Sequence, residues 1–207
     1  MSMDRLYAMN GAPCSCGRPH GFTAKVISGA GVVGRIGDVT REFGAKKVFV
    51  LSDLNTYEAA GERVCHLLAD DGIRFQSFTL PSREPHPDEY WVGSAVMHME
   101  PDCEAVVAVG SGVVNDIGKM LAALSRLPYV IVGTAPSMDG YASATSSMTR
   151  DGLKVSINTK AADVIIGDTD ILCNAPMHLL QAGLGDMIAK YVSIRSEEHT
   201  SELQSLS

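Results

Sequence analysis

Two glycine-rich segments have the residue types that can hold a phosphate. The first glycine loop (residues 29–34, GAGVVG) matches the Gly-x-Gly-x-x-Gly pattern, and Asp53 ends the next strand-like run, where a ribose-binding acid is expected. The second glycine loop consists of Gly110, Ser111 and Gly112, between an apolar run and a helical pattern. Glycines let a phosphate approach the backbone, and the free N–H groups of a helix N-terminus attract it. Each loop could also be a plain turn between a strand and a helix.

Further polar side chains have both a chemical and a structural interpretation. Asn115 and Asp116 lie in the first turn of the helix expected after the second glycine loop, where they could cap it or reach a ribose hydroxyl. Asp139 lies in the sequence Ser-Met-Asp-Gly, which is typical of a turn. Asp186 and Lys190 have the i, i+4 spacing of an ordinary surface ion pair on a helix.

The elements that must position these residues alternate along the chain. Strands are expected at residues 25–28, 47–52, 73–80, 105–110, 128–133 and 162–168, and helices at 57–70, 89–99 and 114–124. Runs such as AVVAVG and PYVIVG show no polar alternation, which is typical of strands buried on both faces. The sequence therefore predicts an α/β fold, a Rossmann-like parallel sheet with helices on both faces.

After residue 133 the pattern changes. Residues 143–158 predict a β-hairpin around Asp151-Gly152, and Pro176 suits the first turn of a helix. Apolar pairs from Leu179 to Val192 recur every four residues, as in a helix with a buried stripe. We expect residues 1–172 to form the nucleotide-binding α/β domain. Residues 173–194 then begin an all-α domain that is cut short, which would leave the stripe exposed and prone to association.

Residues 195–207 (RSEEHTSELQSLS) continue neither pattern. The run RSEEHTSELQS resembles the in-frame translation of a common sequencing-library adapter. We therefore expect these residues to be a non-native tail. The alternative is a polar, disordered terminus.

Composition narrows the classes of function. A formal net charge of −7, with scattered lysines and arginines, argues against a nucleic-acid binder. No apolar run reaches the roughly 20 residues that a membrane span requires. Five irregularly spaced cysteines indicate no disulfide framework and fit a reducing cytoplasm. The expected partner is a small molecule.

The order of the motifs resembles a known superfamily. The chain contains, in sequence, KKVFVLSD, GERV, AVVAVGSGVVNDIGK, VGTAPSMDGYAS and AGLGDMIAKY. Over residues 24–194 this series is similar to the superfamily that joins dehydroquinate synthase, glycerol dehydrogenase and the iron-type alcohol dehydrogenases. The segments SDLNTYEAAG, GSGVVNDIGK, SMDGYAS and GLGDMIAKY look most like the sn-glycerol-1-phosphate dehydrogenases.

The resemblance implies roles for individual residues and decides against the first glycine loop. It places the cofactor pyrophosphate at the second glycine loop. It also implies roles for residues around the cofactor, the substrate and the metal. Asp53 matches the adenosine-ribose acid, Asp116 lies near the other ribose, and Thr134 and Ser137 line the cofactor. Asp139 matches a substrate-side acid, Asp186 is the first ligand of a divalent metal, and Lys190 could contact a substrate phosphate.

The implied metal site is incomplete in this sequence. A catalytic divalent metal takes three protein ligands, whereas the family's two histidines follow the aspartate on later helices. Here the only histidine after Asp186 is His199, in the suspected tail. We therefore predict that this chain does not hold the metal tightly; zinc and nickel both suit the ligand types. Cys14, Cys16 and His20 form a weak candidate for a local zinc site, and a plain turn is the alternative.

The resemblance implies an enzyme that reduces dihydroxyacetone phosphate reversibly to sn-glycerol 1-phosphate, using NAD(P)H and a divalent metal, and that forms a homo-oligomer at full length. Asp53 favours NAD over NADP as the cofactor, although neighbours such as Asn55 and Thr56 can change the shape of the pocket. One alternative is a glycerol or other alcohol dehydrogenase, which would remain active on a substrate without phosphate. Another is a nucleotide-binding module without catalysis. We expect this chain, as given, to be inactive.

Overall fold

The computed structural model describes residues 3–8, 10–13, 21 and 23–204. Its centre is a six-stranded sheet in the order β1-β8-β5-β4-β2-β3, and every pairing within it is parallel. The strands are β1 (Lys25–Gly29), β2 (Lys47–Asp53), β3 (Arg74–Leu80), β4 (Ala105–Gly110), β5 (Tyr129–Gly133) and β8 (Val164–Asp168). The predicted α/β fold with a parallel sheet is confirmed. Residues 14–20, which include Cys14, Cys16 and His20, lie outside the described residues.

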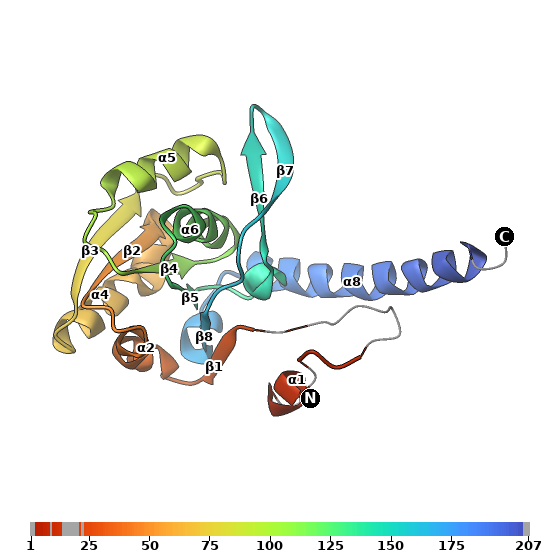
Figure 1. The fold of residues 1–207 in the computed structure, drawn as a ribbon, viewed down its shortest axis with the longest axis horizontal. Coiled ribbons are helices and arrows are strands. Elements are labelled where there is room, and N and C mark those ends of the chain that lie inside the picture. Colours follow the sequence, from red (N-terminus) through yellow and green to blue (C-terminus); the bar gives the residue numbers. More distant parts are fainter. Residues whose placement is uncertain (1–2, 9, 14–20, 22, 205–207) are drawn as a thin grey trace.

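Helices flank the sheet on both faces (Figure 1). The helices of the described chain are α1 (Met3–Ala8), α2 (Ile36–Glu42), α3 (Leu54–Thr56), α4 (Glu62–Asp70), α5 (Glu89–His98), α6 (Gly112–Ser125), α7 (Thr169–Leu172) and α8 (Met177–Gln204), with short 3-10 segments η1 (Val32–Arg35) and η3 (Gly140–Ala142); α1 and α8 lie away from the sheet. Between α3 and α4 lies a π-helical turn, η2 (Tyr57–Gly61), so the helix expected at 57–70 is not uniformly α-helical. In the described part of the chain, no helix is both long and apolar enough to cross a membrane.

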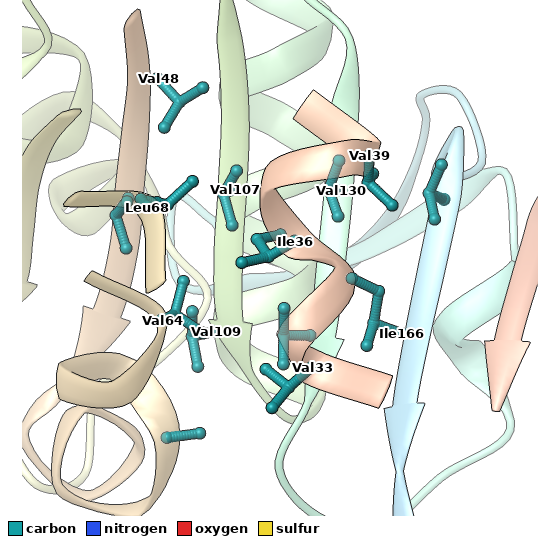
Figure 2. Packing of buried hydrophobic residues seen from close by; sticks show 14 of the residues in the cluster. Val33, Ile36, Val39, Val48, Val64, Leu68, Val107, Val109, Val130 and Ile166 are labelled. Carbon is teal, nitrogen blue, oxygen red and sulfur yellow. The ribbon is translucent and has the colours of Figure 1, made fainter. Parts of the chain in front are cut away.

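Two apolar layers hold these helices on the sheet, because successive strand side chains point to opposite faces. On one face, valines of the central strands pack against η1, α2 and α4; Figure 2 shows Val107 and Val109 of β4 beside Ile36 and Leu68. On the other face, Val106 and the other strand side chains that point to that side pack against α5 and α6. The central strands are buried on both sides, which explains why their sequences lack polar alternation.

The predicted hairpin is present as β6 (Thr145–Arg150) and β7 (Leu153–Asn158), and it extends away from the sheet (Figure 1). Asp151 and Gly152 both have positive φ, 51° and 76°, as a tight two-residue hairpin turn requires. The backbone N–H of Asp151 donates to Glu89 Oε1 at 2.8 Å, which ties the hairpin tip to the start of α5.

Helix α8 projects away from the sheet, and its backbone continues without a break through Gln204 (Figure 1). The stripe expected to be buried in a complete helical domain is exposed here: Leu184, Met187, Ile188, Tyr191 and Val192 are each more than half exposed. This confirms the expected exposed apolar face. The division at residue 172 and the non-native origin of residues 195–207 stay predictions.

The strand order creates one topological switch point. From β2 the chain moves outward to β3, and it then returns to the other side of β2 to form β4 and, further out, β5. Connections from β2 and β4 therefore diverge, and the crevice between the carboxyl ends of two such strands is where ligands of open α/β sheets bind. The second glycine loop follows β4, and Asp53 ends β2.

Candidate functional site

The second glycine loop turns the chain directly from β4 into α6. A Cβ at Gly110 would lie 2.4 Å from the Cβ of Val114, so glycine is needed there for close packing of strand and helix. A Cβ at Gly112 would meet only Met138 Cγ, at the ordinary distance of 3.7 Å. Ser111 is the N-cap residue of α6 but makes no side-chain cap, so the helix N-terminus keeps its positive field for a ligand. Because a Cβ at Gly112 would meet no close neighbour, packing does not explain the glycine at this position.

Asp53 lies across the switch point from this loop. Leu51 of β2 pairs with Ala108 of β4, and the same register extended by two residues places Asp53 opposite Gly110. Asp53 is buried and caps α3: its Oδ1 accepts from the Thr56 N–H at 2.8 Å, and its own N–H donates to Thr56 Oγ1 at 2.9 Å. Among the described residues, the Asp53 Oδ2 atom has no hydrogen-bond partner. Every fully buried side-chain nitrogen or oxygen in this part of the chain has a partner, so Oδ2 is in contact with solvent. One carboxylate oxygen is thus left for a ligand.

The first glycine loop is already occupied by a carboxylate of the protein. Asp168, fully buried at the end of β8, accepts from the N–H groups of Gly31 at 3.1 Å and Val33 at 3.0 Å. It also accepts from Asp170 N at 3.0 Å. Burial acts to raise the pKa of Asp168, but these N–H donors outweigh burial and hold the pKa below its ordinary value. The N–H groups that a phosphate would use here are therefore taken.

The first two polar residues inside α6 face the protein instead of capping the helix. Asn115 is buried, accepts from the Tyr129 hydroxyl at 3.1 Å and donates from Nδ2 to Gly140 O at 3.4 Å. The capping role considered for Asn115 is wrong because Ser111 occupies the N-cap position. Asp116 forms an ion pair with the buried Lys119 at 3.0 Å. Burial raises the pKa of Asp116, and the Lys119 charge opposes that rise.

Lys119 connects this helix to the hairpin. Its Nζ also donates to the Thr145 carbonyl at the start of β6, so one buried ammonium ties α6 to the hairpin base. The Asp116 carboxylate is part of this linkage, about one turn of α6 after Gly112. Its place near a ribose stays a prediction.

The residues after β5 border the same edge of the sheet. The Thr134 N–H donates to Gly110 O at 3.1 Å, which joins the ends of β4 and β5. The Tyr141 hydroxyl donates to Ala135 O at 2.7 Å and lies 3.3 Å from Gly110 O. Burial raises the pKa of Tyr141, so the phenol stays protonated as a donor. Ser137 is half-buried in the adjoining residues 136–139. This segment borders an apolar cavity of about 180 Å³ lined by Gly133, Pro136, Met138, Tyr141, Ile165, Ile166, Gly167 and Leu172.

Three residues singled out in the sequence meet where α8 crosses residues 136–139. A Cβ at Gly183 would lie 1.8 Å from Pro136 O, so glycine allows the helix to rest on this backbone. One turn further, Asp186 Oδ2 accepts from the Asp139 N–H at 2.8 Å. Lys190 Nζ lies 3.3 Å from Asp139 Oδ2. The i, i+4 ion pair considered as an alternative role for Asp186 and Lys190 is not formed, because Lys190 reaches the loop instead.

The described residues do not complete a metal site. Within the described ranges, no group of three or more histidine, cysteine, aspartate or glutamate side chains is placed to hold a metal ion. The Asp186 carboxylate accepts from the backbone N–H of Asp139, whose own carboxylate is engaged by Lys190. The side chain of His199 lies outside the described part.

Two functional residues are not evident from the sequence. Asp168 ends an apolar strand and gave no local signal of its role, because its partners Gly31 and Val33 are more than a hundred residues away. Arg83 follows β3 and forms an ion pair with Glu58, within reach of the Asp53 charge. Its position after a strand on the same edge as Asp53 was the available signal, since parallel strands bring their carboxyl ends together.

Comparison with known proteins identifies the family. Residues 27–176 match the family profile described as iron-containing alcohol dehydrogenase. The glycerol-1-phosphate dehydrogenase, NAD(P)+, of Geobacillus thermodenitrificans is 35% identical over 152 residues, which are 72% of this chain and 38% of that protein. The enzyme of the same name from Methanothrix thermoacetophila is 36% identical over 172 residues, 82% of this chain and 48% of that protein. The chain thus spans less than half of each of these two relatives.

Solved structures agree on the fold. Butanol dehydrogenase A of Thermotoga maritima, described as NADH-dependent, aligns with a TM-score of 0.73 and 22% identity over 83% of this chain and 49% of that one. Glycerol dehydrogenase from Schizosaccharomyces pombe aligns with a TM-score of 0.71 and 23% identity over 81% of this chain and 43% of that one. At such identities the likeness establishes the α/β architecture alone.

Proposed function

Because the chain belongs to the iron-containing alcohol dehydrogenase family, we propose that it binds NAD(P)H at the second glycine loop, for the reversible reduction of dihydroxyacetone phosphate to sn-glycerol 1-phosphate. The observation that carries the cofactor site is the contrast between the loops. The second lies at the topological switch point with an open Gly112, whereas the N–H groups of the first are held by Asp168.

The cofactor fits the residues that line the switch point. The pyrophosphate would lie against Gly110, Ser111 and Gly112 at the positive end of α6, and the Asp53 Oδ2 would accept a ribose hydroxyl. The ends of β4 and β5, joined through Thr134 and Gly110, would hold the nicotinamide half, with Ser137 and Asp116 nearby. Bound nicotinamide supplies the hydride, and these residues orient it.

The substrate would lie between this edge of the sheet and α8. Lys190 is about half exposed and is the cation of the cluster with Asp139 and Asp186. A substrate phosphate would compete with the Asp139 carboxylate for that ammonium, and the released Asp139 would face the substrate. The name shared by the relatives, glycerol-1-phosphate dehydrogenase, supports a phosphorylated substrate.

We assign Asp186 as one ligand of the divalent metal that the family name implies. The described residues do not fit a metal site by themselves, since they bring no group of three candidate ligands together around Asp186. No step of the proposal therefore runs through the ion. The hydrogen bond from the Asp139 N–H holds one Asp186 oxygen towards the substrate side.

Binding of NADH to the purified chain, followed by nucleotide fluorescence, tests the cofactor site. Gly112→Asp places a carboxylate against the proposed pyrophosphate. At about 4 Å and an intermediate dielectric, this repulsion should weaken binding by at least about 100-fold. Gly34→Asp is the matched control: it adds the same charge to the first loop, where a new Cβ meets nothing within 4 Å and no positive φ is needed.

The expected result is loss of NADH binding in Gly112→Asp and unchanged binding in Gly34→Asp, with both variants folded by circular dichroism. Loss in Gly34→Asp alone would assign the cofactor to the first loop. Equal binding in all three proteins, or no binding by the folded parent chain, would refute the proposed site.

A further inference from the structure

Three polar side chains form a cluster beside Asp53 at the carboxyl ends of β2 and β3. The two terminal nitrogens of Arg83 contact the two carboxylate oxygens of Glu58, at 2.6 Å and 3.3 Å. Arg83 Nη1 also donates to Asn55 Oδ1 at 2.7 Å. The guanidinium is thus held by three acceptor atoms, which makes use of its fork of donors.

The backbone near Arg83 is held as well as the side chain. Asn55 Nδ2 donates to Arg83 O at 2.7 Å, so Asn55 binds both ends of the same residue. The Leu54 N–H donates to Ser82 O at 3.4 Å. Leu54 and Asn55 immediately follow Asp53, so these contacts fix Arg83 relative to the candidate ribose acid.

Charge couples the cluster to Asp53. Hydrogen bonding to Glu58 is the main cause that raises the pKa of Arg83, and the negative charge of Asp53 adds to it. Hydrogen bonding to Arg83 in turn lowers the pKa of Glu58. The side chains of Arg83 and Glu58 are 58% and 63% exposed, so a ligand can reach the guanidinium and displace the Glu58 carboxylate.

We propose that Arg83 is a specificity-determining residue that binds the 2′-phosphate of NADPH, and that Glu58 competes with this phosphate for the guanidinium. The inference rests on the proposed function, because it needs the adenosine ribose at Asp53. A nearby arginine is the usual means by which a dinucleotide site accepts a 2′-phosphate, and bidentate arginine–phosphate pairing is strong.

The two acidic residues then set the balance between the cofactors. Asp53 accepts the 2′-hydroxyl of NADH and repels a 2′-phosphate. Arg83 offsets that repulsion once the phosphate displaces Glu58. The parent chain is therefore expected to bind both cofactors, with NADH bound more tightly.

Dissociation constants for NADH and NADPH, measured with the purified chain by fluorescence titration, test the assignment. Arg83→Gln should weaken NADPH binding about tenfold or more and leave NADH binding within about twofold, since charge-assisted hydrogen bonds to the 2′-phosphate alone are lost. Glu58→Gln should strengthen NADPH binding several-fold. Arg74→Gln is the matched control, because this exposed arginine lies at the opposite end of β3 and its loss removes the same charge.

An unchanged ratio of the two dissociation constants in both Arg83→Gln and Glu58→Gln would overturn the assignment. Equal weakening of NADH and NADPH by Arg83→Gln would also overturn it, because Arg83 would then only hold the loop. An Arg74→Gln effect as large as that of Arg83→Gln would reduce the result to general electrostatics. If the folded parent chain binds neither nucleotide, the proposed function fails first and the inference with it.

Discussion

Replacing Asp168 by alanine removes the carboxylate that holds the first glycine loop against the end of β8. Three N–H groups lose their acceptor: Gly31, Val33 and Asp170. Gly31 and Asp170 are exposed, so water can replace the carboxylate at those two groups. Val33 is completely buried, and an unsatisfied buried donor costs about 1–3 kcal/mol. With the smaller losses at the exposed groups, we expect Asp168→Ala to lower the free energy of unfolding by about 3 kcal/mol.

Asp168→Asn separates the charge from the shape of the side chain. The amide oxygen can still accept, but its NH₂ group faces donors on the other side, so we expect a loss of about 2 kcal/mol at neutral pH. The assay is urea unfolding followed by far-ultraviolet circular dichroism.

The stability difference between the parent protein and Asp168→Asn should depend on pH, and the pKa of Asp168 gives the sign of that dependence. The pKa of Asp168 is lowered in the folded state from the ordinary value of 3.8. A lowered acid pKa stabilises the fold above the unfolded pKa, and this contribution disappears as the pH falls through the folded pKa. The stability difference between parent and Asp168→Asn should therefore be constant from neutral pH to about pH 5 and shrink below about pH 4. A cost below about 1 kcal/mol for Asp168→Ala, or a gap that grows on acidification, would refute this account of the loop.

Two further predictions concern the elements around the site. Gly183→Ala places a Cβ against Pro136 O, 1.8 Å away, so α8 must move off residues 136–139. Amide hydrogen exchange in residues 177–193 should therefore accelerate while the sheet stays protected. Unchanged exchange would contradict the contact. Lys119→Ala leaves the half-buried Asp116 without its partner and the Thr145 carbonyl without its donor. We expect the free energy of unfolding in urea to fall by about 3 kcal/mol and amide hydrogen exchange across the hairpin to become faster. A cost near zero would show that Lys119 does not tie the hairpin to α6.

Local patterns in the sequence determined the sheet, one loop geometry and the hairpin. The uninterrupted apolar run of β4 requires burial on both faces, and the structure buries all of it. Gly110 lies where the sequence predicted that a strand passes directly into a helix, and a Cβ there would clash with Val114. Asp151 and Gly152 predicted a turn with positive φ, which both residues adopt. These features depend on neighbours within a few residues, so a sequence read along its length contains them.

The resemblance in motif order, more than any single motif, chose between the two glycine loops. By spacing alone, the first loop matched the dinucleotide pattern better than the second, which has Asn115 in place of the third glycine. Residues 24–194 nevertheless carried an ordered series of segments, and the match to iron-containing alcohol dehydrogenases over residues 27–176 confirms that family. The individual roles assigned to Asp53, Asp116, Thr134, Ser137 and Lys190 remain proposals.

Only the tertiary structure decided which polar groups meet. Asp168 fills the first glycine loop because β8 is inserted between β5 and β1, a strand order that no local pattern specifies. Lys190 binds Asp139 instead of Asp186 because Gly183 lets α8 rest on residues 136–139. Arg83 comes to lie beside Asp53 because β2 and β3 are parallel neighbours. Periodicity and turn chemistry are short-range properties of the chain, whereas these contacts depend on how separate strands and helices pack.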